Sequence, residues 1–277
     1  MTELSIKQIK QKYRHSDLPR HWWQGWLCFV LGCPNSWLIS HEEYVLNSDE
    51  EERFLDGIAK MNQGVPLAYL TGEQAFFGCS FLVNEHTLIP RADTERLIEV
   101  VLDWVHRHKH AYQGTLLDLG TGTGCIAITL AKELPTWQVL GCDISSDALQ
   151  VAKDNARRLM ADNCQFVQSH WLDGISGSFD VIVSNPPYIA KDDEHLSGLT
   201  HEPMTALVAD DAGMADIVHI VAQARAFLTI GGLLAIEHGY DQGAAARQLL
   251  TDCGYHDVAT IRDYGDNDRL TVGVWHG

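Results

Sequence analysis

The sequence predicts an α/β protein in which helices cover both faces of a mostly parallel sheet, preceded by a small helical domain. From residue 115 onward, short apolar runs alternate with helical segments, which is typical of parallel strands joined by crossover helices. Before residue 75, apolar side chains instead recur at helical spacing. The chain has 277 residues, of which 45% are hydrophobic, and this suffices for about two domains with cores of their own.

The first 75 residues form the predicted helical domain. Its first helices are marked by two apolar stripes: Ile6, Ile9 and Tyr13, then Trp22, Trp23, Trp26, Leu27 and Val30. Because their spacing is helical, we expect the tryptophans in the core rather than in a stacking platform. A third helix is expected after Ser48, with Ser48 as its cap, since the acids of Asp49–Glu52 suit the positive end of a helix dipole.

A β-hairpin is predicted between the two domains. Residues Gln74–Val83 are rich in aromatic and β-branched side chains, and Gly78 can supply the turn. We assign residues 76–90 to this hairpin linker. Residues 91–277 are assigned to the α/β domain, whose first helix is expected to start near Asp93.

Seven short apolar runs in the α/β domain are the candidate strands. They are Thr115–Leu119, Gln138–Cys142, Cys164–Gln168, Phe179–Ser184, Leu233–Glu237, Val258–Arg262 and Leu270–Trp275. Helices are expected between most of them, and this alternation predicts the parallel sheet.

Charge and composition narrow the functions that are open to the chain. The formal net charge is −17, and 26 acids against 13 bases place −13 of it on residues 91–277. This excess disfavours a protein that binds nucleic acid through many phosphate contacts, so we expect no direct DNA binding. No apolar run reaches the ~20 residues of a membrane span, and no signal-peptide pattern opens the chain. We therefore expect a cytoplasmic protein without a membrane partner, with its seven scattered cysteines reduced.

A glycine-rich turn follows the first strand of the α/β domain. Gly120, Thr121, Gly122, Thr123 and Gly124 form a Gly-x-Gly-x-Gly pattern. Glycines let the backbone turn sharply and approach a ligand closely, and ligands of open α/β sheets bind beyond the carboxyl ends of the strands. A tight structural turn is the alternative explanation, because the third glycine of a dinucleotide-binding loop is missing.

An acid at the end of the second strand strengthens the case for a ligand. Asp143 lies 19 residues after Gly124, where a carboxylate can accept both hydroxyls of a ribose. The alternative is a helix cap or a local turn with Ser145 and Ser146. Together the turn and the acid favour an adenosine-containing cofactor. S-adenosylmethionine fits better than a nicotinamide, since it has no pyrophosphate to cradle at a helix end.

The fourth strand runs into the tetrapeptide Asn185-Pro186-Pro187-Tyr188. Two prolines cannot continue a central strand, but they make a stiff turn at its end. The Asn185 side-chain carbonyl and the Pro186 backbone carbonyl can then accept both hydrogens of one NH2 group. Such a group is a weak nucleophile, so fixing its orientation toward a methylsulfonium would supply most of the catalysis. Tyr188 can pack on the planar target group, and an ordinary proline turn is the alternative.

These features together resemble one known family. The glycine turn, Asp143, the tetrapeptide, Thr87–Arg91 and the tail Arg262–Arg269 closely resemble the PrmC (HemK) family over essentially the whole chain. The resemblance implies a class I S-adenosylmethionine-dependent methyltransferase fold with a seven-stranded Rossmann-like sheet. It also implies transfer of a methyl group to the side-chain amide nitrogen (N5) of the glutamine in the Gly-Gly-Gln motif of class 1 peptide chain release factors. S-adenosylhomocysteine would be the other product.

The resemblance assigns roles to individual residues. The cofactor would be held by Gly120, Thr121, Gly122, Thr123, Gly124, Asp143, Trp171 and Asn185, with Trp171 near the adenine. The substrate glutamine would be bound, and the reaction catalysed, by Asn185, Pro186, Pro187 and Tyr188. Glu202-Pro203 with Ala206-Leu207 matches a further family segment, and residues 1–75 would recognise the substrate.

Three positions depart from the family pattern. Proline often follows the arginine of the Ile-Pro-Arg segment, where this chain has Ala92. A glutamate is common where Ala75 stands, and an aromatic residue is common where His201 stands. We expect these changes to affect docking of the release factor rather than cofactor binding.

Two other functions stay open from the sequence. An adenine-N6 DNA or RNA methyltransferase would use the same tetrapeptide to grip the exocyclic amine of a flipped base. The acid excess and the lack of a basic, aromatic-interleaved segment speak against it. A cofactor-binding module without enzymatic activity is the other possibility, and the intact tetrapeptide argues against that one.

No metal site is expected. His106, His108 and His110 alternate with basic residues, and a solvated helix end explains them better than a metal site does, because no acid or thiol ligands cluster there. His238 ends a strand beside the predicted pocket and is left without a role, since water can take the proton of a methylated amide.

Overall fold

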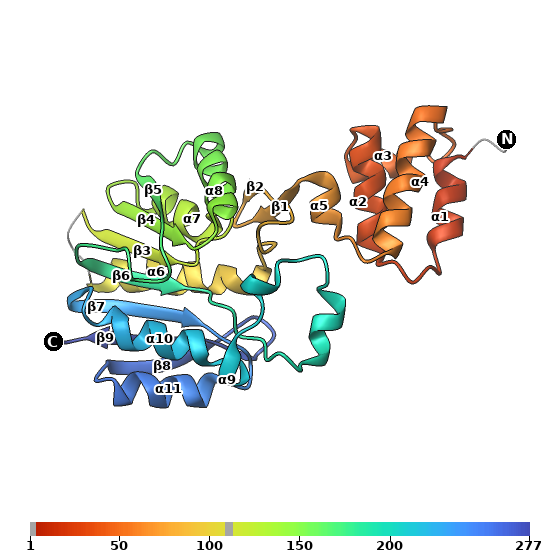
Figure 1. Ribbon diagram of the computed structural model, residues 1–277. Coiled ribbons are helices and arrows are strands. Elements are labelled where there is room, and N and C mark those ends of the chain that lie inside the picture. Colours follow the sequence, from red (N-terminus) through yellow and green to blue (C-terminus); the bar gives the residue numbers. More distant parts are fainter. Residues whose placement is uncertain (1–3, 109–112) are drawn as a thin grey trace. The chain divides into compact units, whose positions relative to one another are not determined.

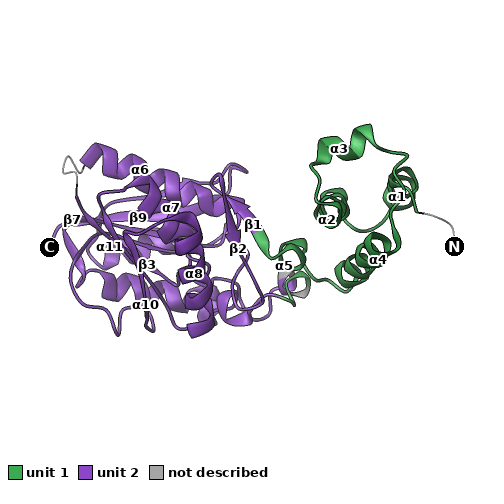
Figure 2. Ribbon diagram, turned by 90° about the horizontal axis from the view of Figure 1, so that it is seen from above, with its two compact units in different colours: residues 1–73, 198–201 green, residues 74–197, 202–277 purple. Residues whose placement is uncertain are grey.

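In the computed structural model, residues 4–108 and 113–277 are described, and the chain forms two compact units (Figures 1 and 2). Unit 1 comprises Met1–Glu73 with Gly198–His201, and unit 2 comprises Gln74–Ser197 with Glu202–Gly277. Within the described residues, every helix falls short of the length and apolar character that crossing a membrane requires.

Unit 1 is built from helices around one apolar core. They are α1 (Ile6–Tyr13), α2 (Arg20–Leu31), α3 (Asn35–Ser40), α4 (Ser48–Asn62) and α5 (Leu67–Thr71). Trp23 and Trp26 lie in this core, as predicted, and the Trp26 indole donates a hydrogen bond of 3.1 Å to the carbonyl of Phe54. Gly57 on α4 makes this packing possible, because a Cβ there would lie 2.1 Å from the Trp26 ring.

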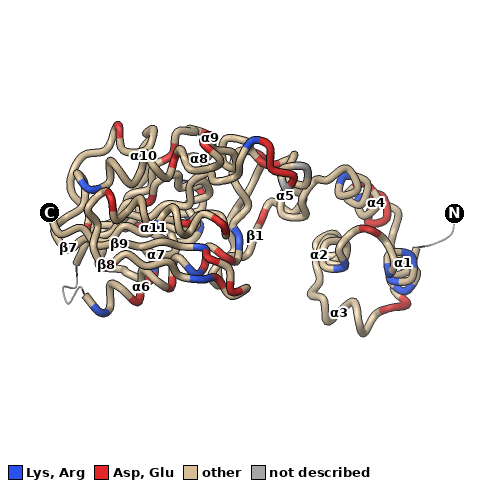
Figure 3. Tube along the Cα trace, turned by 90° about the horizontal axis from the view of Figure 1, so that it is seen from below, with Lys and Arg blue, Asp and Glu red and all other residues tan. Residues whose placement is uncertain are grey.

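The helix ends of unit 1 are capped by local polar side chains. Ser5 and Gln8 form a capping box at the start of α1. The predicted cap of α4 was wrong by one residue: Asn47 accepts from the backbone N–H of Glu50 over 2.9 Å, and Glu50 accepts from that of Asn47 over 2.9 Å. Asn caps a helix as well as Ser does, and here Ser48 is already helical. Figure 3 shows basic residues on α1 and acidic residues at this start of α4.

A two-stranded hairpin, whose first residue Glu73 is the last of the continuous part of unit 1, begins unit 2, as predicted. It consists of β1 (Glu73–Phe76) and β2 (Cys79–Leu82). Both turn residues, Phe77 and Gly78, have positive φ angles of 45° and 72°, the backbone twist that suits two-residue hairpin turns. Phe76 and Phe81 are buried and meet edge to face.

Unit 2 contains a seven-stranded sheet with helices on both faces (Figure 1), which confirms the predicted α/β class. Its strands are β3 (Thr115–Leu119), β4 (Gln138–Asp143), β5 (Cys164–Gln168), β6 (Phe179–Ser184), β7 (Leu228–Glu237), β8 (His256–Arg262) and β9 (Asp268–Trp275). The spatial order is β5-β4-β3-β6-β7-β9-β8. Strand β9 runs antiparallel to both β7 and β8, and the other pairings between the described strands of this sheet are parallel.

The helices of unit 2 cover two separate apolar layers. The helices of this unit are α6 (Glu95–His108), α7 (Cys125–Glu133), α8 (Ser146–Leu159), α9 (Asp210–Gly213), α10 (Ala215–Ala224) and α11 (Gly243–Asp252). Side chains of α6, α7 and α8 pack in one layer, and those of α10 and α11 pack in the other. Short 3-10 turns lie at η1 (Ala92–Thr94), η2 (Glu194–Gly198) and η3 (Met204–Ala206).

The strand β7 is longer than predicted. It begins at Leu228 rather than at Leu233, and it includes Gly231 and Gly232, which interrupt the apolar pattern in the sequence. The pairing of β6 with β7 shifts between Phe179 and Val181, so the strand accommodates this glycine pair as an irregularity.

The parallel register places three loop residues at one edge of the sheet. In the two ladders made by β3, Leu119 pairs with Cys142 on one side and with Ser184 on the other. The residues that follow these three are Gly120, Asp143 and Asn185. Since carboxyl ends of parallel strands meet at the same edge, the register alone brings the three together.

Asn155 on α8 fastens the hairpin to the glycine turn. Its side chain is fully buried. Its Oδ1 accepts from the backbone N–H of Leu82 over 2.7 Å, and its Nδ2 donates to the carbonyls of Leu82 and Thr123 over 3.0 and 2.9 Å.

Replacing Asn155 with Ala is expected to destabilise unit 2 by roughly 2–4 kcal/mol, because three partly or fully buried backbone groups would lose their partner. Urea unfolding followed by circular dichroism measures the loss. The exposed Lys153 on the same helix gives the control variant Lys153→Ala, expected within about 0.5 kcal/mol of the parent. A loss at Asn155 no larger than that of the control would contradict this account.

Candidate active site

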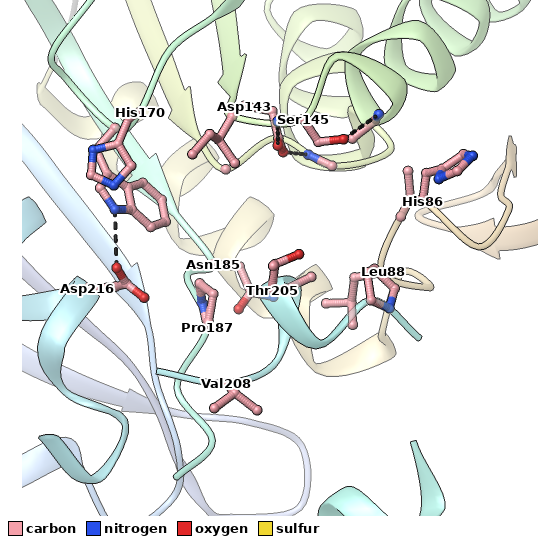
Figure 4. A pocket seen from close by; sticks show the side chains of 18 of the residues that line it. His86, Leu88, Asp143, Ser145, His170, Asn185, Pro187, Thr205, Val208 and Asp216 are labelled. Atoms are coloured by element: carbon pink, nitrogen blue, oxygen red, sulfur yellow. Dashed lines mark hydrogen bonds between the residues drawn. The ribbon is translucent and has the colours of Figure 1, made fainter. Parts of the chain in front are cut away.

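A cavity of about 480 Å³ opens at the carboxyl ends of the strands of unit 2 (Figure 4). A volume of this size is typical of small-molecule sites. Of the residues predicted to bind a cofactor, five line it: Gly120, Gly122, Asp143, Trp171 and Asn185. Thr121, Thr123 and Gly124 lie behind this wall and are not part of the lining.

The glycine turn depends on conformations that glycine adopts without strain. Gly120 and Gly122 have φ angles of 72° and 54°. A Cβ at Gly120 would lie 3.2 Å from the ring of Trp171, so a larger residue there would press on the tryptophan. The turn therefore lets its backbone approach the aromatic wall of the cavity.

Asp118 anchors the turn from inside the protein. Its Oδ2 accepts from the Thr121 hydroxyl over 2.6 Å and from the backbone N–H of Ala127, at the start of α7, over 3.2 Å. Burial raises the pKa of Asp118 to about 7, against these two hydrogen bonds. Thr121 thus has a structural role in this structure.

Asp143 holds the turn from the second strand. Its Oδ2 accepts from the backbone N–H of Gly122 and its Oδ1 from that of Ser145, both over 2.9 Å (Figure 4). Burial raises the pKa of this carboxyl, and the backbone N–H groups oppose the rise. Ser145, not Asp143, caps α8, through a bond from Ala148 to its hydroxyl. A carboxylate offers about four acceptor positions, so two remain for the hydroxyls of a ribose.

Trp171 forms one side wall of the cavity. It follows β5 with a positive φ of 47°, a backbone conformation that bulky residues rarely adopt. Its indole N–H donates to Asp216 over 3.2 Å (Figure 4). The strained backbone and this bond together fix the ring beside Gly120.

Asn185 is oriented by Thr94, a residue that no motif in the sequence marks. Its Nδ2 donates to the hydroxyl of Thr94 over 3.1 Å, which fixes the amide with its Oδ1 as the remaining acceptor. Asn185 and Pro187 line the cavity. Pro186 and Tyr188 do not, and the Tyr188 hydroxyl instead lies 3.4 Å from Glu237.

Glu237 supports the tetrapeptide from the next strand. Ile236 pairs with Ser184 in the β6–β7 ladder, so Glu237 lies beside Asn185. Burial raises the pKa of Glu237 to about 7, while a hydrogen bond with Thr94 and the charge of Arg269 oppose the rise. Thr94 thus bonds Asn185 and lies close enough to Glu237 to lower its pKa.

The tail segment Arg262–Arg269, which carries part of the family resemblance, lies near Glu237. Asp263 accepts from the backbone N–H groups of Gly265 and Asn267 over 2.8 and 3.0 Å, and from Arg269 over 3.1 Å. Arg269 in turn lies 3.7 Å from Asp93. The tail therefore places one partly buried positive charge near Glu237.

Two further segments singled out by the resemblance meet each other. The buried carboxylate of Glu202 accepts from the backbone N–H of Ile89 over 3.1 Å and pairs with Arg91. Leu88 and Pro203, which flank this contact in the sequence, line the cavity. His201 lies in unit 1 and its ring bonds the carbonyl of Gln63 over 2.9 Å.

The histidines considered in the sequence do not form part of the cavity wall. His238 is fully buried between Thr271 and its own loop, and burial lowers its pKa. His106 and His108 lie at the exposed end of α6. His110 lies outside the described residues.

Glu237→Gln is expected to change how stability depends on pH. The folded-state pKa near 7 exceeds the ordinary 4.5, so the protonated form adds stability that is complete below about pH 4.5 and is lost as pH rises through 7. Glutamine cannot ionise. The free energy of unfolding should therefore shift in favour of the variant by roughly 1–3 kcal/mol between about pH 5 and pH 8.

Urea titrations across this pH range measure the difference between variant and parent. Glu133→Gln, at an exposed position of α7, is the control that makes the same carboxyl-to-amide change away from the buried group. A constant difference between Glu237→Gln and the parent at every pH would rule out ionisation of a buried Glu237.

Comparison with known proteins agrees with this architecture. The family described as PrmC N-terminal domain matches residues 6–72, and the family described as methyltransferase small domain matches residues 99–252. A solved methyltransferase structure from Pyrococcus furiosus shares the fold with a TM-score of 0.55 at 19% identity, covering 80% of this chain and 99% of that one.

Curated relatives match over nearly the whole chain. A release factor glutamine methyltransferase from Escherichia coli is 42% identical over 275 residues, covering 98% of both chains. One from Vibrio cholerae is 45% identical over 253 residues, covering 90% of this chain and 87% of that one. The predicted class I methyltransferase fold and the predicted family are therefore confirmed, and the chain belongs to the release factor glutamine methyltransferase family.

Proposed function

We propose that this chain transfers a methyl group from S-adenosylmethionine to the side-chain amide nitrogen (N5) of the glutamine in the Gly-Gly-Gln motif of class 1 peptide chain release factors. The observation that carries the proposal is the orientation of Asn185. Thr94 holds its NH2 group, so its Oδ1 is presented as an acceptor in a cavity that the glycine turn and Asp143 also line. Family membership supports this reaction over adenine-N6 methylation of DNA or RNA.

The cavity suits S-adenosylmethionine. Asp143 retains acceptor positions for a ribose, Trp171 offers an aromatic wall for an adenine, and Gly120 and Gly122 leave space beside them. When bound, the cofactor supplies an electrophilic methyl group on a sulfonium sulfur. In this proposal Thr121, Thr123 and Gly124 act indirectly, by holding the turn in shape.

The tetrapeptide orients the nucleophile. An amide nitrogen is weak because its lone pair is delocalised, so the chain must fix its position and direction. In this proposal Asn185, which lines the cavity, accepts one N–H group of the substrate glutamine through its Oδ1. The other N–H group is accepted by the backbone carbonyl of Pro186, although Pro186 is not among the residues that line the cavity. The nitrogen forms its bond to carbon as the sulfur–carbon bond breaks, and the surplus N–H proton passes to water. Catalysis then depends on orientation. Positioning of the reacting groups can lower the activation free energy by at most about 7–11 kcal/mol.

Thr94, Tyr188 and Glu237 act as positioning residues in this proposal. Thr94 fixes which end of the Asn185 amide faces the cavity. Glu237 bonds Tyr188 and shares Thr94, so it holds both ends of the tetrapeptide. Neither Tyr188 nor Glu237 lines the cavity.

The remaining parts of the chain would serve the protein partner. We assign residues 1–75 to recognition of the release factor, residues 76–90 to the hairpin linker and residues 91–277 to catalysis. The excess of −13 on residues 91–277 suits a partner whose surface is basic because it faces RNA. Release factors act in translation, so we place the enzyme in the cytoplasm.

Mass spectrometry of a release factor after incubation with the protein and S-adenosylmethionine tests the function directly. We expect one added methyl group on the glutamine of the Gly-Gly-Gln peptide. A release factor with Gly-Gly-Ala in its place should gain none. Methyl transfer to DNA or RNA but not to the release factor would refute the proposal.

Asn185→Ala is expected to abolish methyl transfer, because the acceptor for the substrate amide is lost. Thr94→Val keeps the shape of Thr94 but removes the partner of the Asn185 NH2 group, and should lower kcat by about 10-fold, as loss of one orienting hydrogen bond does. Thr94→Ser should restore most of the rate. Steady-state kinetics with release factor measure all three, and parental turnover by Asn185→Ala would refute its role.

Asp143→Ala is expected to weaken S-adenosylmethionine binding by on the order of 100-fold, since hydrogen bonds to a charged group contribute about 1.5–3 kcal/mol each. Isothermal titration calorimetry measures the affinity. Asp147→Ala, an exposed acid in the first turn of α8, is the matched control and should bind as the parent does. Equal affinity of the Asp143→Ala variant and the control would remove Asp143 from the cofactor site.

A further inference from the structure

We propose that His170, Asp173 and His219 form a binding site for a divalent transition-metal ion such as Zn²⁺, separate from the groups that orient the substrate amide. This goes beyond the proposed methyl transfer and does not depend on it. It also departs from the sequence-based expectation of no metal, because His219 lies far along the chain from the other two residues.

The three side chains converge from two elements of unit 2. His170 and Asp173 lie in the loop after β5, and His219 lies on α10. Each offers one ligand atom, and these atoms all lie within 4.8 Å of one another. The rings of His170 and His219 have centroids 5.7 Å apart, and His170 Nδ1 lies 3.1 Å from Asp173 Oδ2.

An unsatisfied ring nitrogen points to a missing ligand. His219 Nε2 is buried and has no hydrogen-bond partner among the described residues. Gln223 Oε1, one turn later on α10, is buried without a partner in the same part of the chain. Buried polar atoms are nearly always satisfied, and leaving one bare costs about 1–3 kcal/mol. The bare nitrogen of His219, on a side chain that meets His170 and Asp173, therefore indicates a site for a ligand that accepts a lone pair.

The ligand set selects the class of ion. Two imidazoles and one carboxylate are the ligands that Zn²⁺ and related ions take with three protein groups and a water. Zinc-to-ligand distances of about 2.0–2.2 Å place tetrahedral ligand atoms roughly 3.3 Å apart. Binding of an ion would require the side chains of His170 and Asp173, which are both exposed, to turn toward His219.

The ion would fasten a loop of the cavity wall to α10. His170 lines the cavity, and the next residue, Trp171, already donates to Asp216 on the same helix as His219 (Figure 4). A bound ion would add a second link between this loop and α10. Binding to the folded state alone raises thermal stability, which gives a readout that needs no methyl transfer.

The chain contains a matched control for this site. His256 and His276 have ring centroids 4.8 Å apart, and His276 Nε2 lies 4.0 Å from Asp257 Oδ2. This second cluster also has two imidazoles and one carboxylate, but among the described residues it has no buried ring nitrogen without a hydrogen-bond partner. Metal binding by exposed histidine pairs in general would therefore occur at both places.

The test uses the full chain without an affinity tag, freed of metal by a chelator. Zn²⁺ is titrated by calorimetry, and Co²⁺ by the absorption of a tetrahedral complex. We expect one ion per chain and a rise in Tm with Zn²⁺. His219→Ala and His170→Gln should each weaken binding by at least about 10-fold and remove the rise, whereas His276→Ala should change neither.

Two results would overturn the proposal. One is Zn²⁺ binding that His219→Ala and His170→Gln leave unchanged, and the other is binding that His276→Ala abolishes. Circular dichroism checks that each variant is folded. If the His219 and His170 variants lose Zn²⁺ binding to a similar extent, misfolding of one variant does not explain the loss. Methyl transfer to release factor is measured separately, so failure of the metal site and failure of the proposed function remain distinguishable.

Discussion

The parallel register of β3, β4 and β6 is the constraint on which the site depends. Because Leu119 pairs with both Cys142 and Ser184, the next residue of each strand arrives at the same edge of the sheet. A slip of one residue would turn every side chain of a strand to its opposite face. The buried apolar layers on both faces forbid such a slip, so the hydrophobic core fixes the positions of the glycine turn, the acid and the amide.

A second set of polar groups, behind the residues that line the cavity, fixes the orientation of Asn185. Thr94 connects Asn185 with Glu237, and Glu237 connects Thr94 with Tyr188 and the charge of Arg269. In a buried setting such a network is rigid when its members are satisfied and costly when they are not. The raised pKa of Glu237 reflects the free energy that burying an ionised carboxylate costs there.

Local patterns predicted much of this structure, and contacts between distant segments were the part they could not predict. Strand limits, the hairpin and the glycine turn follow from short-range apolar patterns, although the glycine pair in β7 hid its first residues. Thr94 lies 91 residues from Asn185, and nothing in its own surroundings marks it as a partner. His219 likewise has meaning only beside His170, which no periodicity reveals. The residues at the ends of the strands could be predicted from the sequence. The distant side chains that contact them could not.

The two backbone bonds of Asp143 bear on the thermodynamics of recognition. They exist within the protein itself, so Gly122 and Ser145 are already ordered by folding. A ligand entering the cavity therefore does not have to immobilise the loop, and less of its interaction energy is lost to entropy. Fragments of the cofactor, such as adenosine alone, would meet the same prepared surface, so their affinity would report the intrinsic strength of each contact rather than the work of organising the turn.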